Sequence, residues 1–206
     1  MKLLQKLLIL SLGLGLAACV PIPLRIYVPE APDGRIVYSS CAFNKHVPNG
    51  IEFTFNKVKA TASIQRLEGR QFIELIFEVP ADYVVQMKSA RIDYTHGPER
   101  THASAVFNEI GLVANPILAR HRKIPNIGSL VQPFFDPIIG VTFPNKVTPA
   151  SSFPHHNFWL AAYIDILPTD EVWVTLPAFT VNGVSTVLPQ IHFRQELLLG
   201  VALMNC

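Results

Sequence analysis

The chain has 206 residues, of which 50% are hydrophobic and 16% are charged. That proportion is enough to bury a sizeable core, and it excludes an intrinsically disordered chain. The formal net charge of +2 comes from Lys2 and Lys6, since the other 15 basic residues equal the 15 acidic residues in number. A body without net charge does not attract nucleic acid over long range, so we expect no nucleic-acid partner.

The first 18 residues have the pattern of a secretory signal. Two lysines precede an apolar run from Leu7 to Leu16, and two alanines follow it. The run is too short to form a stable transmembrane helix. We therefore predict that residues 1–18 are a cleaved signal peptide.

The residues Leu16-Ala17-Ala18-Cys19 resemble the lipobox of bacterial lipoproteins. The resemblance implies that Cys19 becomes the first mature residue and carries a diacylglycerol and an N-acyl chain such as palmitate. Several acyl chains on one residue hold a protein stably on a lipid bilayer. By the same resemblance to bacterial lipoproteins, Val20, which is not aspartate, implies sorting to the outer membrane. The alternative is an ordinary signal peptide that leaves Cys19 unmodified.

The next segment is rich in proline. Four of the fourteen residues from Val20 to Asp33 are prolines, which excludes a helix. We predict that residues 19–33 form an extended tether, which at about 3.1 Å per residue would hold the domain about 40 Å from the lipid surface. The alternative is that Leu24 to Val28 joins the folded domain as an edge strand.

Apolar and polar residues alternate with a period of two through most of the chain after Gly34, as in strands with one buried face. Such runs occur at residues 51–56, 58–65, 73–79, 172–174 and 187–193, and 158–167 is also strand-prone. Asn182-Gly183 is the strongest local signal for a tight hairpin. We predict one all-β domain over residues 34–206, an antiparallel β-sandwich of immunoglobulin-like or jelly-roll-like type, with a small β-barrel as the alternative.

Two segments are weak candidates for helices, Ala103–Ala114 and Arg194–Met204. In the second, Leu197, Leu199 and Val201 alternate with other residues, so we favour a final strand there and keep the helix as the alternative.

Two cysteines remain once Cys19 is assigned to the lipid. Cys41 and Cys206 form an even pair, which in an oxidising compartment predicts a disulfide bond. The bond would close a loop of about 165 residues and contribute about 4–5 kcal/mol in the chain-entropy model. The alternative is two unpaired thiols, and a catalytic role for Cys41 has less support because no nucleophile signature surrounds it.

The proline-rich region 120–157 contains the most metal-like feature, His155-His156. Two adjacent histidines bind one ion only from an irregular loop, and here they would need further ligands such as His46, His121 or Asp136. The basic run Arg120–Lys123 would suit an acidic partner or lipid headgroups. For both features we favour the simpler interpretation of a solvated loop, and we predict no metal and no cofactor.

Asp165, Asp170 and Glu171 are the strongest candidates for acid–base chemistry on a glycan. Acidic residues are equally typical of turns between strands, and that interpretation needs no further residue. Trp159 and Trp173, with Tyr163, would line a ligand face or fill the core, and the core is more usual for tryptophan in a strand. We therefore predict no catalytic residue and no enzyme activity.

Taken together, these features predict a lipoprotein anchored by Cys19 to a bacterial membrane, most simply the outer membrane, and facing the periplasm. We expect a non-enzymatic binding or scaffold module whose partners are the bilayer and an envelope protein, which an exposed strand edge could recruit. One alternative is a lipoprotein that binds a glycan or small ligand. Another is an envelope hydrolase that acts on peptidoglycan or lipid.

Overall fold

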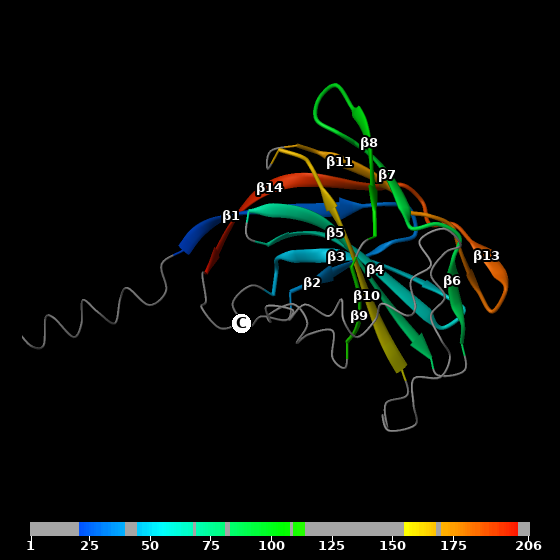
Figure 1. Ribbon diagram of the computed structural model, residues 1–206. Coiled ribbons are helices and arrows are strands. Elements are labelled where there is room, and N and C mark those ends of the chain that lie inside the picture. Colours follow the sequence, from blue (N-terminus) through cyan, green and yellow to red (C-terminus); the bar gives the residue numbers. More distant parts are fainter. Residues whose placement is uncertain are drawn as a thin grey trace, which may run out of the picture.

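The computed structural model describes residues 21–39, 45–67, 69–80, 83–107, 109–113, 155–167 and 170–201. These residues form fourteen strands and no helix, and the strands build two facing antiparallel sheets and a smaller third sheet (Figure 1). Each described sheet is open at both edges. The prediction of an all-β antiparallel sandwich is therefore confirmed.

The first main sheet, sheet A, joins strands from both ends of the chain. Its strands lie in the order β1 (Pro21–Glu30), β14 (Ile191–Val201), β11 (Val172–Thr175), β7 (Arg91–His96) and β8 (Thr101–Val106). The pairing of β1 with β14 is antiparallel and continuous over ten residue pairs, from Pro21 with Val201 to Glu30 with His192.

The second main sheet, sheet B, has six strands, of which only the third to the fifth along the chain follow one another through short turns. Their order is β2 (Arg35–Tyr38), β3 (Pro48–Phe55), β4 (Val58–Leu67), β5 (Arg70–Pro80), β10 (His155–Ile164) and β9 (Glu109–Val113). The third sheet contains β13 (Val184–Thr186), β12 (Phe179–Val181) and β6 (Val85–Met87), and it lies at the end of the sandwich away from the start of β1 (Figure 1).

The main core fills the space between the two large sheets. Alternate residues of each strand point inward, so Phe77 of sheet B and Phe193 of sheet A are both about 99% buried or more. The third sheet adds Phe179, whose ring contacts that of Phe77 edge-on at 5.3 Å between centroids. The apolar half of each alternating pattern in the sequence therefore corresponds to this core.

A second, smaller apolar cluster lies on the other face of sheet B. Phe72 and Ile76 of β5 pack there with Trp159 and Ala161 of β10. Strand β5 is consequently buried on both faces. The prediction that tryptophan belongs to the core holds for Trp159, but Trp173 lies on the outer face of sheet A and is partly exposed.

The local predictions for turns and ends have mixed outcomes. Asn182 and Gly183 have φ angles of 50° and 82°, as in a type I′ hairpin turn, and they join β12 to β13 as expected. The final segment is a strand, β14. The helical candidate at 103–114 is wrong, because its described residues form the end of β8 and all of β9.

The N-terminal segment differs from the expected tether. Residues 21–30 form β1 and lie within sheet A, so the alternative of an edge strand is the observed one. The extended conformation that proline imposes also fits a strand at a sheet edge, where a missing N–H costs no ladder hydrogen bond. The predicted signal segment 1–18 and all three cysteines, Cys19, Cys41 and Cys206, lie outside the described residues.

Candidate functional site

A cavity of about 330 Å³ opens where the inner face of β1 and β14 meets the neighbouring part of sheet B. It is lined from sheet A by Arg25, Ile26, Tyr27 and Gln195, and from sheet B and its β2–β3 connection by Ser39, Val47, Pro48, Asn49, Ile64, Gln65, Arg66 and Gln71. Polar side chains therefore dominate its wall, in contrast to the apolar core beside it.

Tyr27 and Gln71 form the fixed part of this wall. The Tyr27 hydroxyl donates a hydrogen bond to Oε1 of Gln71 at 2.8 Å, which joins the two sheets. The Gln71 amide in turn donates to the carbonyl oxygen of Ile166 at 3.3 Å, and the Gln71 side chain is buried. Both polar groups are thus oriented by the protein before any ligand arrives.

The Tyr27 hydroxyl stays protonated over the physiological range. Burial, reinforced by the negative charge of Asp170, raises the pKa of Tyr27 to about 12. The hydrogen bond with Gln71 and the positive charge of Arg66 act in the opposite direction and are outweighed. Tyr27 is therefore suited to hydrogen bonding and not to accepting a proton from a substrate.

The charged groups of the cavity are all positive. Arg25 and Arg66 are exposed, and the described lining contains no acidic residue. The amides of Asn49 and Gln65 lie beside them and contact each other at 3.4 Å, while Gln65 also donates to Ser63 at 3.0 Å. Two guanidinium groups with several amides and hydroxyls suit an anionic ligand that carries further hydrogen-bonding groups.

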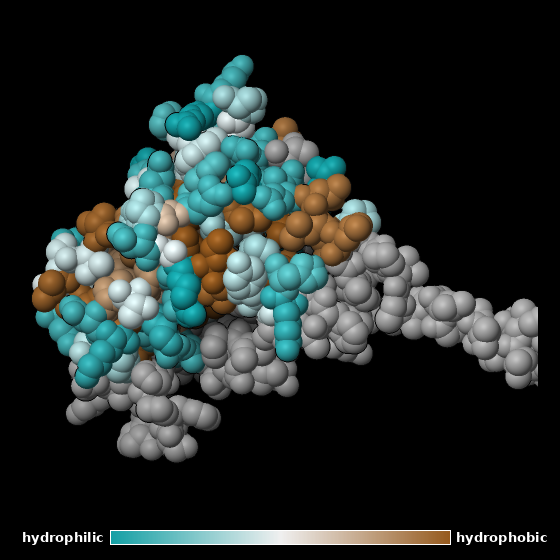
Figure 2. Space-filling view, turned by 180° about the vertical axis from the view of Figure 1, so that it is seen from behind, coloured by the Kyte–Doolittle hydropathy of each residue, from teal (hydrophilic) through white to brown (hydrophobic). Residues whose placement is uncertain are grey.

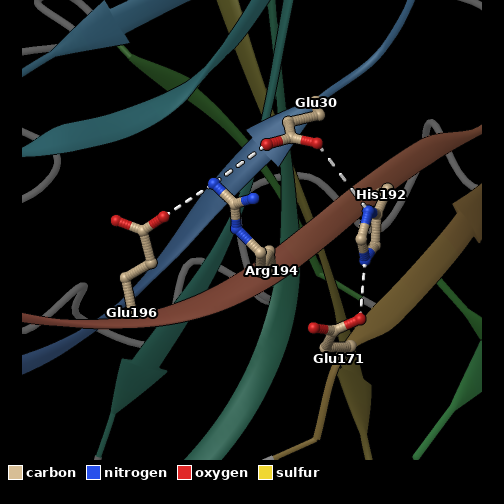
Figure 3. A network of polar contacts seen from close by, with 5 residues as sticks. All are labelled: Glu30, Glu171, His192, Arg194 and Glu196. Carbon is tan, nitrogen blue, oxygen red and sulfur yellow. Dashed lines mark hydrogen bonds and ion pairs between the residues drawn. The ribbon is translucent and has the colours of Figure 1, made fainter.

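A network of charged side chains covers the opposite face of the same two strands (Figure 3). Arg194 contacts Glu30 at 3.1 Å and Glu196 at 2.7 Å. His192 contacts Glu171 at 3.1 Å and lies 4.0 Å from Glu30. Exposed ion pairs contribute little energy each. Their geometry, however, links β1 to β14 and to the residue before β11, and so supports the register that places Arg25 and Tyr27 at the cavity.

The same outer face carries a stack of planar side chains. The Trp173 and His192 rings are parallel within 3°, with centroids 4.5 Å apart, and the Arg100 guanidinium lies 4.3 Å from the Trp173 centroid. Trp173 is therefore occupied by protein neighbours on this surface. We assign the stack to the packing of sheet A and of the β7–β8 turn, which contains Arg100.

Two of the three candidate carboxylates, Asp170 and Glu171, contact protein side chains, and the third, Asp165, is exposed. Asp170 is buried, and its Oδ2 accepts a hydrogen bond from the Leu167 amide at 3.0 Å and contacts Nδ1 of His96 at 2.9 Å. Glu171 contacts His192, and Asp165 is exposed. Asp170 thus fixes the turn before β11, in agreement with the simpler interpretation of these residues.

The other sequence candidates are not brought together. His155 and His156 begin β10, paired with Pro80 and Val79, and do not lie in the irregular loop that metal binding required. His46 is exposed, whereas Arg120–Lys123 and Asp136 lie outside the described residues. Within the described part of the chain, no group of three His, Cys, Asp or Glu side chains has the geometry for a metal ion.

The cavity residues were missed in the sequence because no local pattern marks them. Arg25 and Tyr27 lie in the segment expected to be a tether, while Asn49, Gln65 and Gln195 are scattered polar residues of predicted strands. One pattern nevertheless indicates a strand here, the alternation of Arg25 and Tyr27 with Leu24, Ile26 and Val28. Such alternation is typical of a strand with two different faces.

Comparison of the chain with protein-family models, with curated proteins and with solved structures gives no match. A further search of the described residues finds no helix of the length and hydrophobicity needed to cross a bilayer.

Proposed function

We propose that this chain is a lipid-anchored, non-enzymatic binding protein of the bacterial envelope, and that its sandwich binds an anionic ligand in the cavity between β1–β14 and sheet B. The observation that carries the proposal is the composition of the cavity. Two arginines and four amide side chains line it, and none of its described lining residues is acidic. Guanidinium and amide groups donate hydrogen bonds to carboxylate and phosphate oxygens, so this lining favours an anionic ligand.

The anchor belongs to the same proposal. The lipobox-like residues end at Cys19, and β1 begins two residues later at Pro21. An acylated Cys19 would therefore place the cavity-lining strand directly at the outer membrane, with the sandwich on the periplasmic side. We also propose the Cys41–Cys206 disulfide, because an even pair of cysteines in an oxidising compartment is typically bonded.

The most fitting ligand class is a fragment of the envelope with carboxylates, hydroxyls and amides. Arginine binds carboxylates through two parallel hydrogen bonds, and Asn and Gln side chains pair with amides or hydroxyls. Soluble muropeptides have all three groups. A neutral chito-oligosaccharide has the hydroxyls and amides but no carboxylate, so it serves as the matched control ligand.

Isothermal titration of the mature protein tests the proposal. Muropeptides should bind, and Arg25→Gln and Arg66→Gln should each weaken binding by about tenfold or more, the value for a lost charge-assisted hydrogen bond. Arg91→Gln is the control, because Arg91 is exposed and pairs with Asp93 away from the cavity. Equal binding of the neutral oligosaccharide, or unchanged affinity in both cavity variants, would contradict the assignment.

The anchor and disulfide are tested separately by mass spectrometry of the protein extracted from membranes. Acylation should add a defined mass to the peptide that contains Cys19, and this added mass should be absent in Cys19→Ser. The Cys19→Ser protein should also be released from the membrane fraction. Peptides that contain Cys41 and Cys206 should be linked before reduction and separate after it. An unmodified Cys19 would exclude the lipoprotein assignment.

A second candidate function is a scaffold for an envelope protein, favoured by strand β8. It lies at an edge of sheet A, contains no proline, and belongs to a hairpin that projects from the body (Figure 1). Such an edge can add a strand of a partner. A photo-crosslinking residue at Ser104 should then capture a partner in cells, with Gln86 as an exposed control position, and equal labelling at both would exclude this candidate.

A further inference from the structure

The free end of the β1–β14 pair carries apolar side chains in contact with solvent. We call three residue pairs near this end, Pro23–Arg25 with Leu197–Leu199, the ribbon end. Leu197 and Leu199 are 65% and 70% exposed. Their direct partners in the register are Arg25 and Pro23, so these four side chains share one face.

This end of the domain is also the one next to the acylation site. Pro21 pairs with Val201, and only Val20 separates Pro21 from Cys19. The space-filling view shows apolar surface at the side of the molecule where β1 begins and β14 ends (Figures 1 and 2). A lipid chain on Cys19 would therefore hold the ribbon end within a few residues of the bilayer.

We propose that the ribbon end docks on the lipid bilayer, with Leu197 and Leu199 inserted among the headgroups and upper acyl chains. The inference rests on the proposed lipid anchor. Exposed leucines favour the interfacial region of a membrane, and Arg25 on the same face can contact lipid phosphates. Glu196, the nearby acidic residue of β14, pairs with Ile26 and so lies on the opposite face.

The docking has a consequence for the cavity. Arg25 belongs both to the ribbon end and to the cavity wall. The cavity therefore opens close to the membrane surface, and its ligand is met at that surface and not deep in the periplasm. The short connection between Cys19 and β1 is what keeps the domain in this position.

The test uses the full lipidated protein in vesicles of phosphatidylethanolamine and phosphatidylglycerol with brominated acyl chains. A tryptophan is introduced as Leu199→Trp, and its fluorescence is obtained by subtracting that of the unsubstituted protein. The matched control is Val187→Trp, because Val187 is 69% exposed and precedes the opposite end of β14. Circular dichroism confirms that both variants fold.

If the ribbon end inserts, the brominated lipid should quench the Leu199→Trp signal at least about twofold more than the Val187→Trp signal, because only the former lies within the interfacial layer. Equal quenching in protein whose Cys19 is shown by mass to be acylated would overturn the docking and leave the anchor intact. An unacylated Cys19 would overturn both. Equal quenching of the two tryptophans by brominated lipid in unlipidated protein would also contradict a specific docking face.

Discussion

A buried carboxylate on the outer face of sheet B allows the contribution of its hydrogen bonds to the free energy of unfolding to be measured. Glu74 of β5 is 5% exposed. One of its oxygens accepts a hydrogen bond from Nε1 of Trp159 at 2.8 Å, and the other accepts one from the Ser63 hydroxyl at 2.8 Å. A buried carboxylate depends strongly on such donors, because water cannot replace them. Trp159→Phe removes one donor while an aromatic ring remains.

The expected cost of Trp159→Phe combines two losses. A hydrogen bond to a charged acceptor contributes about 1.5–3 kcal/mol. The smaller ring also gives up buried apolar area next to Phe72, whose centroid lies 6.5 Å from that of Trp159, and we estimate this at about 1 kcal/mol. Trp159→Phe should therefore lower the free energy of unfolding by about 3 kcal/mol.

Urea denaturation followed by circular dichroism measures this change. The control is Trp173→Phe, since Trp173 is partly exposed on sheet A and stacks on His192. It should cost less than about 1 kcal/mol. The midpoint for Trp159→Phe should fall clearly below that of the control, with the dependence on urea concentration unchanged.

A double-mutant cycle with Glu74→Gln isolates the interaction itself. If the Trp159 donor acts through the carboxylate, the two substitutions should be less than additive by about 1–2 kcal/mol. Additive costs would refute the reasoning, as would a loss for Trp159→Phe no larger than that of Trp173→Phe. Either result would mean that the indole contributes through packing alone.

Three further predictions follow from local geometry. Gly50→Ala would place a Cβ 2.8 Å from the carbonyl oxygen of Ala62, a backbone atom, and should cost about 2 kcal/mol in urea denaturation. The pKa of Tyr27 rises from 10.0 to about 12 on folding, so its neutral hydroxyl should stabilise the fold fully below pH 10, and this stabilisation should be lost between pH 10 and 12. The free energy of unfolding of Tyr27→Phe should therefore decline less over that pH range than that of the unsubstituted protein. Asp170→Ala should cost about 2 kcal/mol by removing the acceptor of the Leu167 amide, and hydrogen exchange at that amide should accelerate.

Three strands of sheet B were predictable because their neighbours in space are also neighbours in sequence. The alternation at residues 51–56, 58–65 and 73–79 corresponds to β3, β4 and β5, which pair in that order. A turn such as Asn182-Gly183 is equally local, since its two positive φ angles suit Asn and Gly. These features depend on side chains within a few residues of one another.

The cavity could not be predicted because it depends on a pairing between the two ends of the chain. Arg25 and Gln195 come together only when β1 pairs with β14, and no local pattern encodes that contact. The two tryptophans show the same limit. Trp159 is buried because β10 is covered on both faces, whereas Trp173 lies on the outer face of sheet A, and alternation alone does not distinguish these environments.

The prolines of β1 explain how one segment can resemble a tether and still be a strand. Pro21, Pro23 and Pro29 occupy alternate positions of the same parity, while the register with β14 is unbroken. A proline has no N–H, so the ladder to β14 uses the even-numbered residues, and the odd-numbered ones face the free edge. That edge then offers N–H groups from Arg25 and Tyr27 but not from the three prolines, which protects it against pairing with another chain. A partner strand would accordingly meet fewer N–H donors at β1 than at β8. Strand β1 instead lines the cavity with one face, and its first residue follows Cys19 by two positions.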